Sequence, residues 1–91
     1  MEAAETLAIQ ALTFIASDGA RLGRFLAETG IGPDQIRAAA REPHFLAGVL
    51  AHLSNDERLL IEFAADTGIA PAEIARARAA LGGPDWEREL P

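Results

Sequence analysis

The sequence predicts an all-α protein, a compact six-helix bundle made of two three-helix repeats that are related by a pseudo-two-fold axis. Two observations favour helices: the 91-residue chain is 49% hydrophobic with much alanine, and its apolar residues recur at helical spacing. A third indicates the repeat, because a Thr-Gly-Ile-x-Pro turn begins at Thr29 and again at Thr67, an offset of 38 residues. The four Phe residues and the Leu, Ile and Val residues must supply the core volume that alanine lacks.

The two copies agree well beyond the turn. The stretch FLAETGIGPDQIRAAA from Phe25 aligns with FAADTGIAPAEIARAR from Phe63, and positions 7–40 share eleven identities in 34 with positions 45–78. Two copies are too few for a solenoid, which needs about three repeats to bury a continuous core. We therefore expect the halves to pack on each other, with the first and fourth helices in the centre. This gives one domain over 1–83 (repeats of about 4–41 and 43–82) and an acidic tail over 84–91.

The first helix is expected over about 4–16, where one stripe holds the apolar residues Leu7, Ala11, Leu12, Phe14 and Ile15. Ser17 and Asp18 can cap a second helix over about 19–29. Gly23 lies in the middle of that helix at a cost of roughly 1 kcal/mol relative to Ala, so we expect a close helix crossing there. Arg24 and Glu28 have the spacing of a helical ion pair.

The turn itself has a clear physical reading. Gly30 is expected to close the second helix in a left-handed conformation, where a Cβ would clash. Ile31 then supplies an apolar contact that folds the chain back. Pro33 suits the first position of a third helix that ends near Arg41, because the missing N–H matters least there.

The second half follows the same plan. Pro43 begins a helix with the strongest apolar stripe of the chain, since the residue before a proline leaves helical geometry. Ser54 and Glu57 have the spacing of a capping box for the fifth helix, and Pro71 opens a sixth helix that buries Ile74, Ala77 and Leu81. Regular structure is expected to end at Gly82-Gly83-Pro84.

Composition excludes several classes of protein. The net charge is −6, so the field of the whole molecule opposes nucleic acid and anionic lipid. Without cysteine there is no disulfide, no Cys-based zinc site and no thiol nucleophile. The N-terminus is acidic, and no apolar run approaches the roughly 18 residues of a membrane span. We expect a cytoplasmic protein that does not enter membranes.

The second turn and its flanks also resemble a DNA-binding helix-turn-helix. The small Ala64 precedes the turn glycine, and Ile69 and Ile74 follow it at the spacing of that motif.

Base-reading side chains are nevertheless scarce. A recognition helix needs Arg, Lys, Asn, Gln or Ser in its first turns. The helix after the second turn offers only Arg76 and Arg78, and the one after the first turn offers Gln35, Arg37 and Arg41 beside the acidic Asp34. A weak DNA-binding transcriptional factor is therefore the alternative function, and nucleic acid is the less favoured partner.

No arrangement of residues indicates catalysis, a cofactor or a metal. His44 and His52 are eight residues apart, about 12 Å along a helix, which is too far to share one metal ion. Asp56 and Glu57 are adjacent, so their side chains diverge, and a capped first turn explains them. We expect no catalytic residue, no cofactor-binding residue and no metal ligand.

The whole chain resembles a bacterial family of short, Ala/Arg-rich, all-helical proteins of unknown function. The matching landmarks are RFLAETGIGPDQIRAAA, EPHFLAGVL, LSNDERLLIEFAADTGI and LGGPDWERE. The resemblance implies an all-α fold and a cytoplasmic setting. It brings no activity, ligand or catalytic residue with it.

The favoured interpretation is a non-catalytic protein–protein interaction or accessory module with an unknown protein partner. The candidate surface combines Arg37 and Arg41, where the two copies differ, with Trp86 and Leu90 of the tail, which only the second half possesses. Trp86 either packs on the bundle, as its large apolar area favours, or docks into a partner. A homodimer through an exposed stripe of either central helix is a further alternative.

Overall fold

A computed structural model describes residues 2–81, which form α-helices and one 3-10 turn and contain no strand. The all-α prediction is confirmed. The elements are α1 (Glu2–Ala16), α2 (Gly19–Thr29), the 3-10 turn η1 (Pro33–Gln35), α3 (Ile36–Ala39), α4 (Pro43–Ser54), α5 (Glu57–Thr67) and α6 (Pro71–Leu81).

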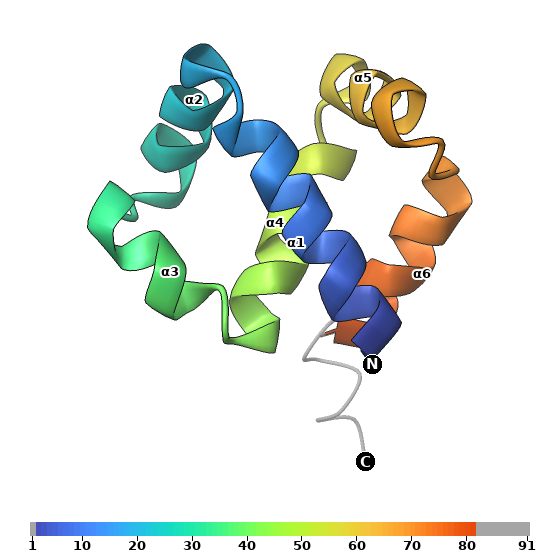
Figure 1. Ribbon diagram of the computed structural model, residues 1–91, viewed down its shortest axis with the longest axis horizontal. Helices are drawn as coiled ribbons and strands as arrows, with labels where there is room; N and C mark the ends of the chain where they lie inside the picture. Colours follow the sequence, from blue (N-terminus) through green and yellow to red (C-terminus); the bar gives the residue numbers. More distant parts are fainter. Residues whose placement is uncertain (1, 82–91) are drawn as a thin grey trace.

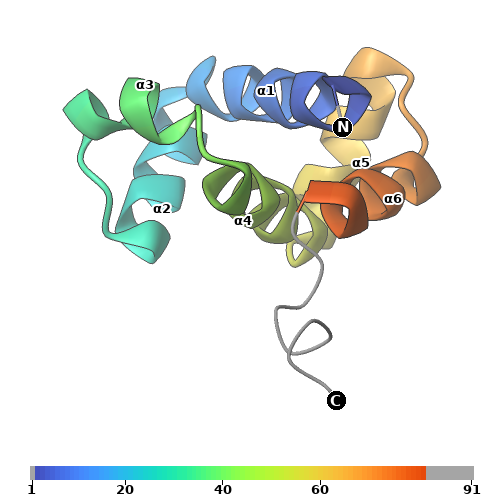
Figure 2. The same cartoon turned by 90° about the horizontal axis from the view of Figure 1, so that it is seen from below.

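The helix α1 crosses α4 in the middle of the molecule (Figure 1). The pair α2 and α3 lies on one side of this crossing, and α5 and α6 lie on the other. Seen from below, α1 and α4 occupy separate layers (Figure 2). The most extensive packing joins α4 to α6, followed by the packing of α1 against both. The expected central position of the first and fourth helices is thus what the structure shows.

The core combines small side chains from α1 with large ones from α4. Ala8 and Ala11 are fully buried, and Ala4 is nearly so. The large core residues of α4 are Leu46, Val49, Leu50 and Leu53. Small residues on one helix and large ones on its neighbour fill the space between them without voids, so α1 can lie close to α4 and α6.

Gly23 does not make the close helix crossing that the sequence suggested. A Cβ built on Gly23 or on Gly48 would meet no atom within 4 Å. Both residues are exposed, because the helix faces that carry them point away from the core. The expectation of a close crossing at Gly23 is therefore wrong, and alanines on α1 provide the close approach.

The two Thr-Gly-Ile corners have matching geometry. Gly30 and Gly68 are both left-handed, with φ of 75° and 78°, and they are the only residues with positive φ among those described. Each donates its N–H to a carbonyl four residues earlier, at 2.8 Å. The predicted glycine caps are confirmed.

The threonine before each glycine closes the corner. Thr29 Oγ1 donates to the carbonyl of Phe25 at 2.9 Å and accepts from the Ile31 N–H at 3.4 Å. Thr67 Oγ1 makes the same two bonds to Phe63 and Ile69 at 2.8 and 3.2 Å. The corner is thus held by its own local hydrogen bonds. The common origin of the halves and their pseudo-two-fold axis remain predictions.

After the corner the halves differ. The expected third helix to about Arg41 is divided into η1 and the four-residue α3, whereas α6 runs for eleven residues. Pro43 explains the early end, because Glu42 before it must adopt an extended backbone, with φ of −100° and ψ of 124°. The chain therefore leaves α3 through tight turns at Arg41 and Glu42.

Aspartates cap both α2 and α5. Asp18 accepts from the Arg21 N–H at 3.0 Å, and Asp56 accepts from the Leu59 N–H at 3.2 Å. The predicted capping box at Ser54 is wrong, because Ser54 is the last residue of α4. The chain turns extended only at Asp56, which makes Asp56 the N-cap.

Three edge-to-face aromatic pairs join the halves. One is formed by Phe25 and Phe45, and the other two correspond to each other in the repeat. Phe14 of α1 packs on Phe63 of α5 with ring centroids 5.4 Å apart. His52 of α4 packs on Phe25 of α2 at 5.1 Å. Each member of the Phe14 pair is related by the 38-residue offset to a member of the His52 pair, and in both pairs the partners come from different halves.

Charged contacts also cross between the halves. His52 Nδ1 lies 3.0 Å from a carboxylate oxygen of Glu28, and Arg24 lies 3.4 Å from Asp56. The expected pair between Arg24 and Glu28 within α2 is therefore wrong, since both side chains turn to the other half. No helix of the described residues is long and apolar enough to cross a bilayer.

The left-handed geometry of the two corners predicts how glycine substitutions change the stability of the protein. Gly30→Val or Gly68→Val should lower the free energy of unfolding by about 1–3 kcal/mol, because a β-branched residue is strained at positive φ. Gly23→Ala is the control: its site is helical and open, so it should raise stability by about 0.5–1 kcal/mol. Urea unfolding followed by circular dichroism measures both. Unchanged stability of the two valine variants would contradict the corner geometry.

The same urea unfolding assay can distinguish Asp56 from Ser54 as the N-cap of α5. Asp56→Ala should reduce stability by about 1 kcal/mol, since it removes the bond to the Leu59 N–H. Ser54→Ala should change it by less than about 0.5 kcal/mol. An equal loss of stability in the two variants would contradict the assignment of Asp56 as the N-cap of α5.

Candidate functional site

The predicted interaction residues are only partly within the described structure. Arg37 lies on α3 and Arg41 in the turn that follows, and both are exposed. Trp86 and Leu90 lie outside the described residues. The surface predicted from these four residues therefore stays a prediction, with its two arginines four positions apart in the sequence.

The corner that resembles a helix-turn-helix carries a carboxylate where a DNA-reading helix needs donors. Glu73, in the first turn of α6, accepts from the Ala70 N–H at 3.2 Å. This bond holds the side chain at the beginning of the helix. A negative charge there would face the phosphates of a docked duplex. After the other corner, α3 has only four residues.

The two histidines lie in different environments. His44 is exposed at the start of α4, whereas His52 is enclosed by Phe25 and Glu28 with 7% of its side chain accessible. Within residues 2–81, no three His, Asp or Glu side chains are grouped closely enough to hold a metal ion.

Asp56 and Glu57 do not converge on a common point. One carboxylate oxygen of Asp56 accepts from the Leu59 N–H, and the other lies 3.4 Å from Arg24. Glu57 is exposed in the first turn of α5. Both oxygens of Asp56 thus serve the cap and an ion pair, which is a structural use of this carboxylate.

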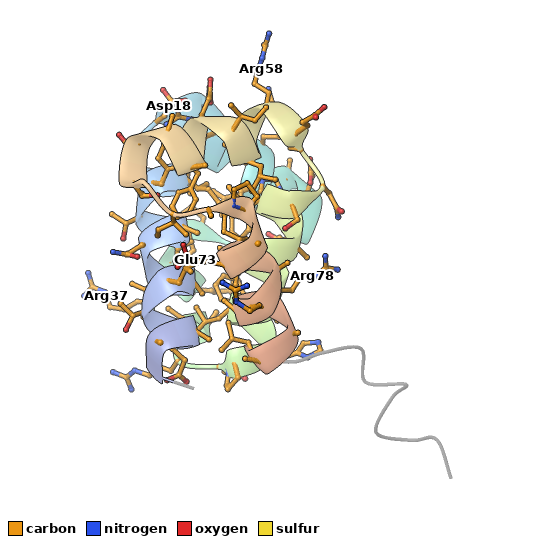
Figure 3. The ribbon with its side chains drawn as sticks, turned by 90° about the vertical axis from the view of Figure 1, so that its right-hand side faces the viewer. Asp18, Arg37, Arg58, Glu73 and Arg78 are labelled. Atoms are coloured by element: carbon orange, nitrogen blue, oxygen red, sulfur yellow. The ribbon has the colours of Figure 1, made fainter. Side chains whose placement is uncertain are left out.

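A charged cleft lies between the beginnings of α2 and α5. It has a volume of about 260 Å³, and its lining residues are Asp18, Ala20, Arg21, Arg24, Asp56, Arg58, Leu59 and Glu62. Arg21 pairs with Glu62 at 3.3 Å and also lies over the Phe14 ring at 4.2 Å. Asp18 and Arg58 mark this end of the molecule, and Arg58 points away from it (Figure 3). Exposed pairs of this kind contribute at most about 1 kcal/mol each.

A larger and mainly apolar hollow, which we name the α1–α5 groove, runs along α1. It has a volume of about 540 Å³, and its lining residues are Thr6, Ile9, Gln10, Thr13, Phe14, Ser17, Asp66 and Thr67. Ile9 is 46% exposed, one of two large apolar side chains so exposed among the described residues. The other, Ile61, does not line the groove. Residues 6–17 carry no charge, so the α1 side of this groove is uncharged throughout.

A third hollow, the α1–α6 groove, lies between the first turns of α1 and the length of α6. It has a volume of about 290 Å³, and its lining residues are Ala3, Ala4, Leu7, Glu73, Arg76, Ala77 and Ala80. Figure 3 shows α1 and α6 side by side with Glu73 between them. Its floor is apolar, and its charged residues both come from α6.

Sequence reasoning missed both apolar grooves. One signal was available: Ile9 lies outside the apolar stripe expected for the first helix, in a stretch that has no charge. A single exposed apolar residue is ordinary on a protein surface, and only its position in a hollow makes Ile9 a candidate contact residue. The hollow itself depends on how α5 and α6 lie beside α1, which local patterns do not report.

The fold and its surface thus define a small all-helical protein with apolar grooves along its first helix. The chain belongs to the family described as "Protein of unknown function (DUF3572)", whose model matches residues 1–84. This confirms the resemblance to a helical family of unknown function. No curated protein and no solved structure matches the chain significantly.

Proposed function

We propose that this protein is a non-catalytic protein–protein interaction module of the cytoplasm that binds its partner in the α1–α5 groove. The observation that supports the proposal is the half-exposed Ile9 in a hollow of about 540 Å³, on the uncharged stretch of residues 6–17. The uncharged polar residues Thr6, Gln10, Thr13 and Ser17 surround it. An apolar centre with a polar rim is the usual anatomy of a protein interface.

The chemistry of the groove favours one kind of occupant. Ile9 and Phe14 offer apolar contact, and the hydroxyl and amide groups offer hydrogen bonds without a charge to desolvate. The helical face of a partner with one or two apolar anchors and no basic cluster would complement this surface. Arg37 and Arg41 form a separate charged patch at α3, on the other side of the crossing (Figure 1). They suit long-range attraction of an acidic partner rather than its anchoring.

Several observations support interaction over catalysis. Asp56 is occupied by its cap and by Arg24, and His52 is enclosed by Phe25 and Glu28. These groups therefore stabilise the fold. The lining of the α1–α5 groove has one ionisable side chain, Asp66, and no base or nucleophile pair.

Binding to random duplex DNA tests the alternative function. We expect no binding at low ionic strength, because the net charge is −6 and the second corner presents Glu73. A fluorescence anisotropy titration with a labelled duplex measures this. Binding that weakens steeply as salt is added would instead support a nucleic-acid factor, since release of counterions gives that dependence.

Photo-crosslinking in native cells tests the proposed surface directly. A photoreactive residue at position 9 should cross-link to a discrete partner, and one at position 61 should not. Ile61 is the matched control because it is also exposed, at 59%, but lies outside the groove. The same products from both positions, or none from position 9, would contradict the proposal.

Once the cross-linked partner has been purified, substitutions at positions 9 and 61 measure how much each position contributes to the binding affinity. Ile9→Glu should weaken binding at least about tenfold, or about 1.4 kcal/mol, because it places a charge in the apolar centre of the interface. Ile61→Glu should leave the affinity unchanged. Isothermal titration calorimetry measures both, and circular dichroism confirms that both variants fold. Light scattering completes the experiment: if the partner is a second copy, the mass will exceed 9.6 kDa as concentration rises.

A further inference from the structure

The α1–α6 groove is apolar, shallow and open, and it lies beside the point where the described chain ends. Its floor consists of Leu7 and four alanines, and its charged residues are Glu73 and Arg76. Ala77 and Ala80 belong to the last two turns of α6, directly before Leu81. The groove is separate from the α1–α5 groove, since the two share no lining residue.

We propose that this groove is the binding site for the chain's own C-terminal segment and that the indole of Trp86 fills it. The proposal does not rest on the proposed function, because it concerns another groove and an intramolecular contact. It chooses between the two fates that the sequence left open for Trp86.

The length of the segment suits the site. Trp86 follows Leu81 by five residues, which can span at most about 17 Å. The groove extends along α6 from Ala80 back to Glu73, seven residues or about 10 Å of helix. A segment that reverses at Gly82-Gly83, where the backbone has the greatest freedom, leaves three residues, or about 10 Å, to run back along α6. Trp86 can therefore reach the end of the groove that Ala77 and Ala80 line.

The chemistry of the groove suits an indole. Alanine side chains between two packed helices leave a flat apolar surface, and a Trp ring covers about 150–250 Å² of such surface. Arg76 is exposed at the edge of the groove, where its guanidinium can lie over the ring face in a cation–π contact. The available volume of about 290 Å³ is larger than a methyl-sized gap and suits one large side chain.

The charges of the groove itself cancel, since its lining contains one acidic and one basic residue, Glu73 and Arg76. Residues 85–90 contain three acidic residues against one arginine. Arg76 is therefore the residue of the groove that can pair with an acidic side chain of this segment.

Because Trp86 is the only Trp of the chain, its fluorescence reports the site directly. In the folded 91-residue chain, we expect Trp86 emission at shorter wavelength than in the urea-unfolded chain, and weak quenching by acrylamide. Ala80→Glu places a charge in the groove, and it should shift emission and quenching to the values of the unfolded chain. Ala79→Glu is the matched control, since Ala79 is exposed on the neighbouring position of α6 but does not line the groove. It should leave both signals unchanged, and circular dichroism should show both variants folded.

Each other result overturns the proposal. Emission of the wild type equal to that of the unfolded chain would show that Trp86 is free. A protected Trp86 in both variants would place it at another site. Protection that disappears on dilution, with a mass above 9.6 kDa at high concentration, would show that the segment binds a second copy. As an independent measure, truncation after Gly83 should lower the urea midpoint, and an unchanged midpoint would also count against the site.

Discussion

The fold depends on the close approach of α1 to α4 and α6, and alanine makes that approach possible. Ala8 and Ala11 are completely buried on α1, opposite a helix whose core residues are leucine and valine. Larger side chains at these positions would separate the helices, at a typical cost of about 1–3 kcal/mol. The alanines Ala3, Ala77 and Ala80 have a second effect, because at the surface of the same helix pair they leave a groove. The composition that permits tight packing inside therefore also shapes the outside.

The sequence predicted those parts of the fold that local chemistry determines. Gly30 and Gly68 could be assigned because a left-handed helix end accepts little else, and helix bounds followed apolar periodicity and proline. The mistakes arose where local chemistry allows two answers. Ser54 and Asp56 can both cap a helix, and the continuation of α4 to Ser54 decided between them. Gly23 fits either a close crossing or an open face, and only the packed structure distinguishes these.

The candidate site was less accessible from sequence than the fold. Differences between the two copies directed attention to Arg37 and Arg41, which are indeed exposed. The α1–α5 groove was not found, because its walls come from residues about fifty positions apart, Phe14 of α1 and Asp66 of α5 among them. Ile9 was the one local indication. A groove is a property of relative helix placement, whereas periodicity describes one helix at a time.

The aromatic pairs have a consequence for how the molecule comes apart. Phe14 of the first half rests on Phe63 of the second, while His52 of the second half rests on Phe25 of the first. Each half therefore packs an aromatic ring against the other half, so neither half would have a complete core if the two were separated. Loss of order in one half removes support from the other. Mutual packing of this kind favours cooperative unfolding of the two halves together, because disorder in one half removes buried contacts from the other.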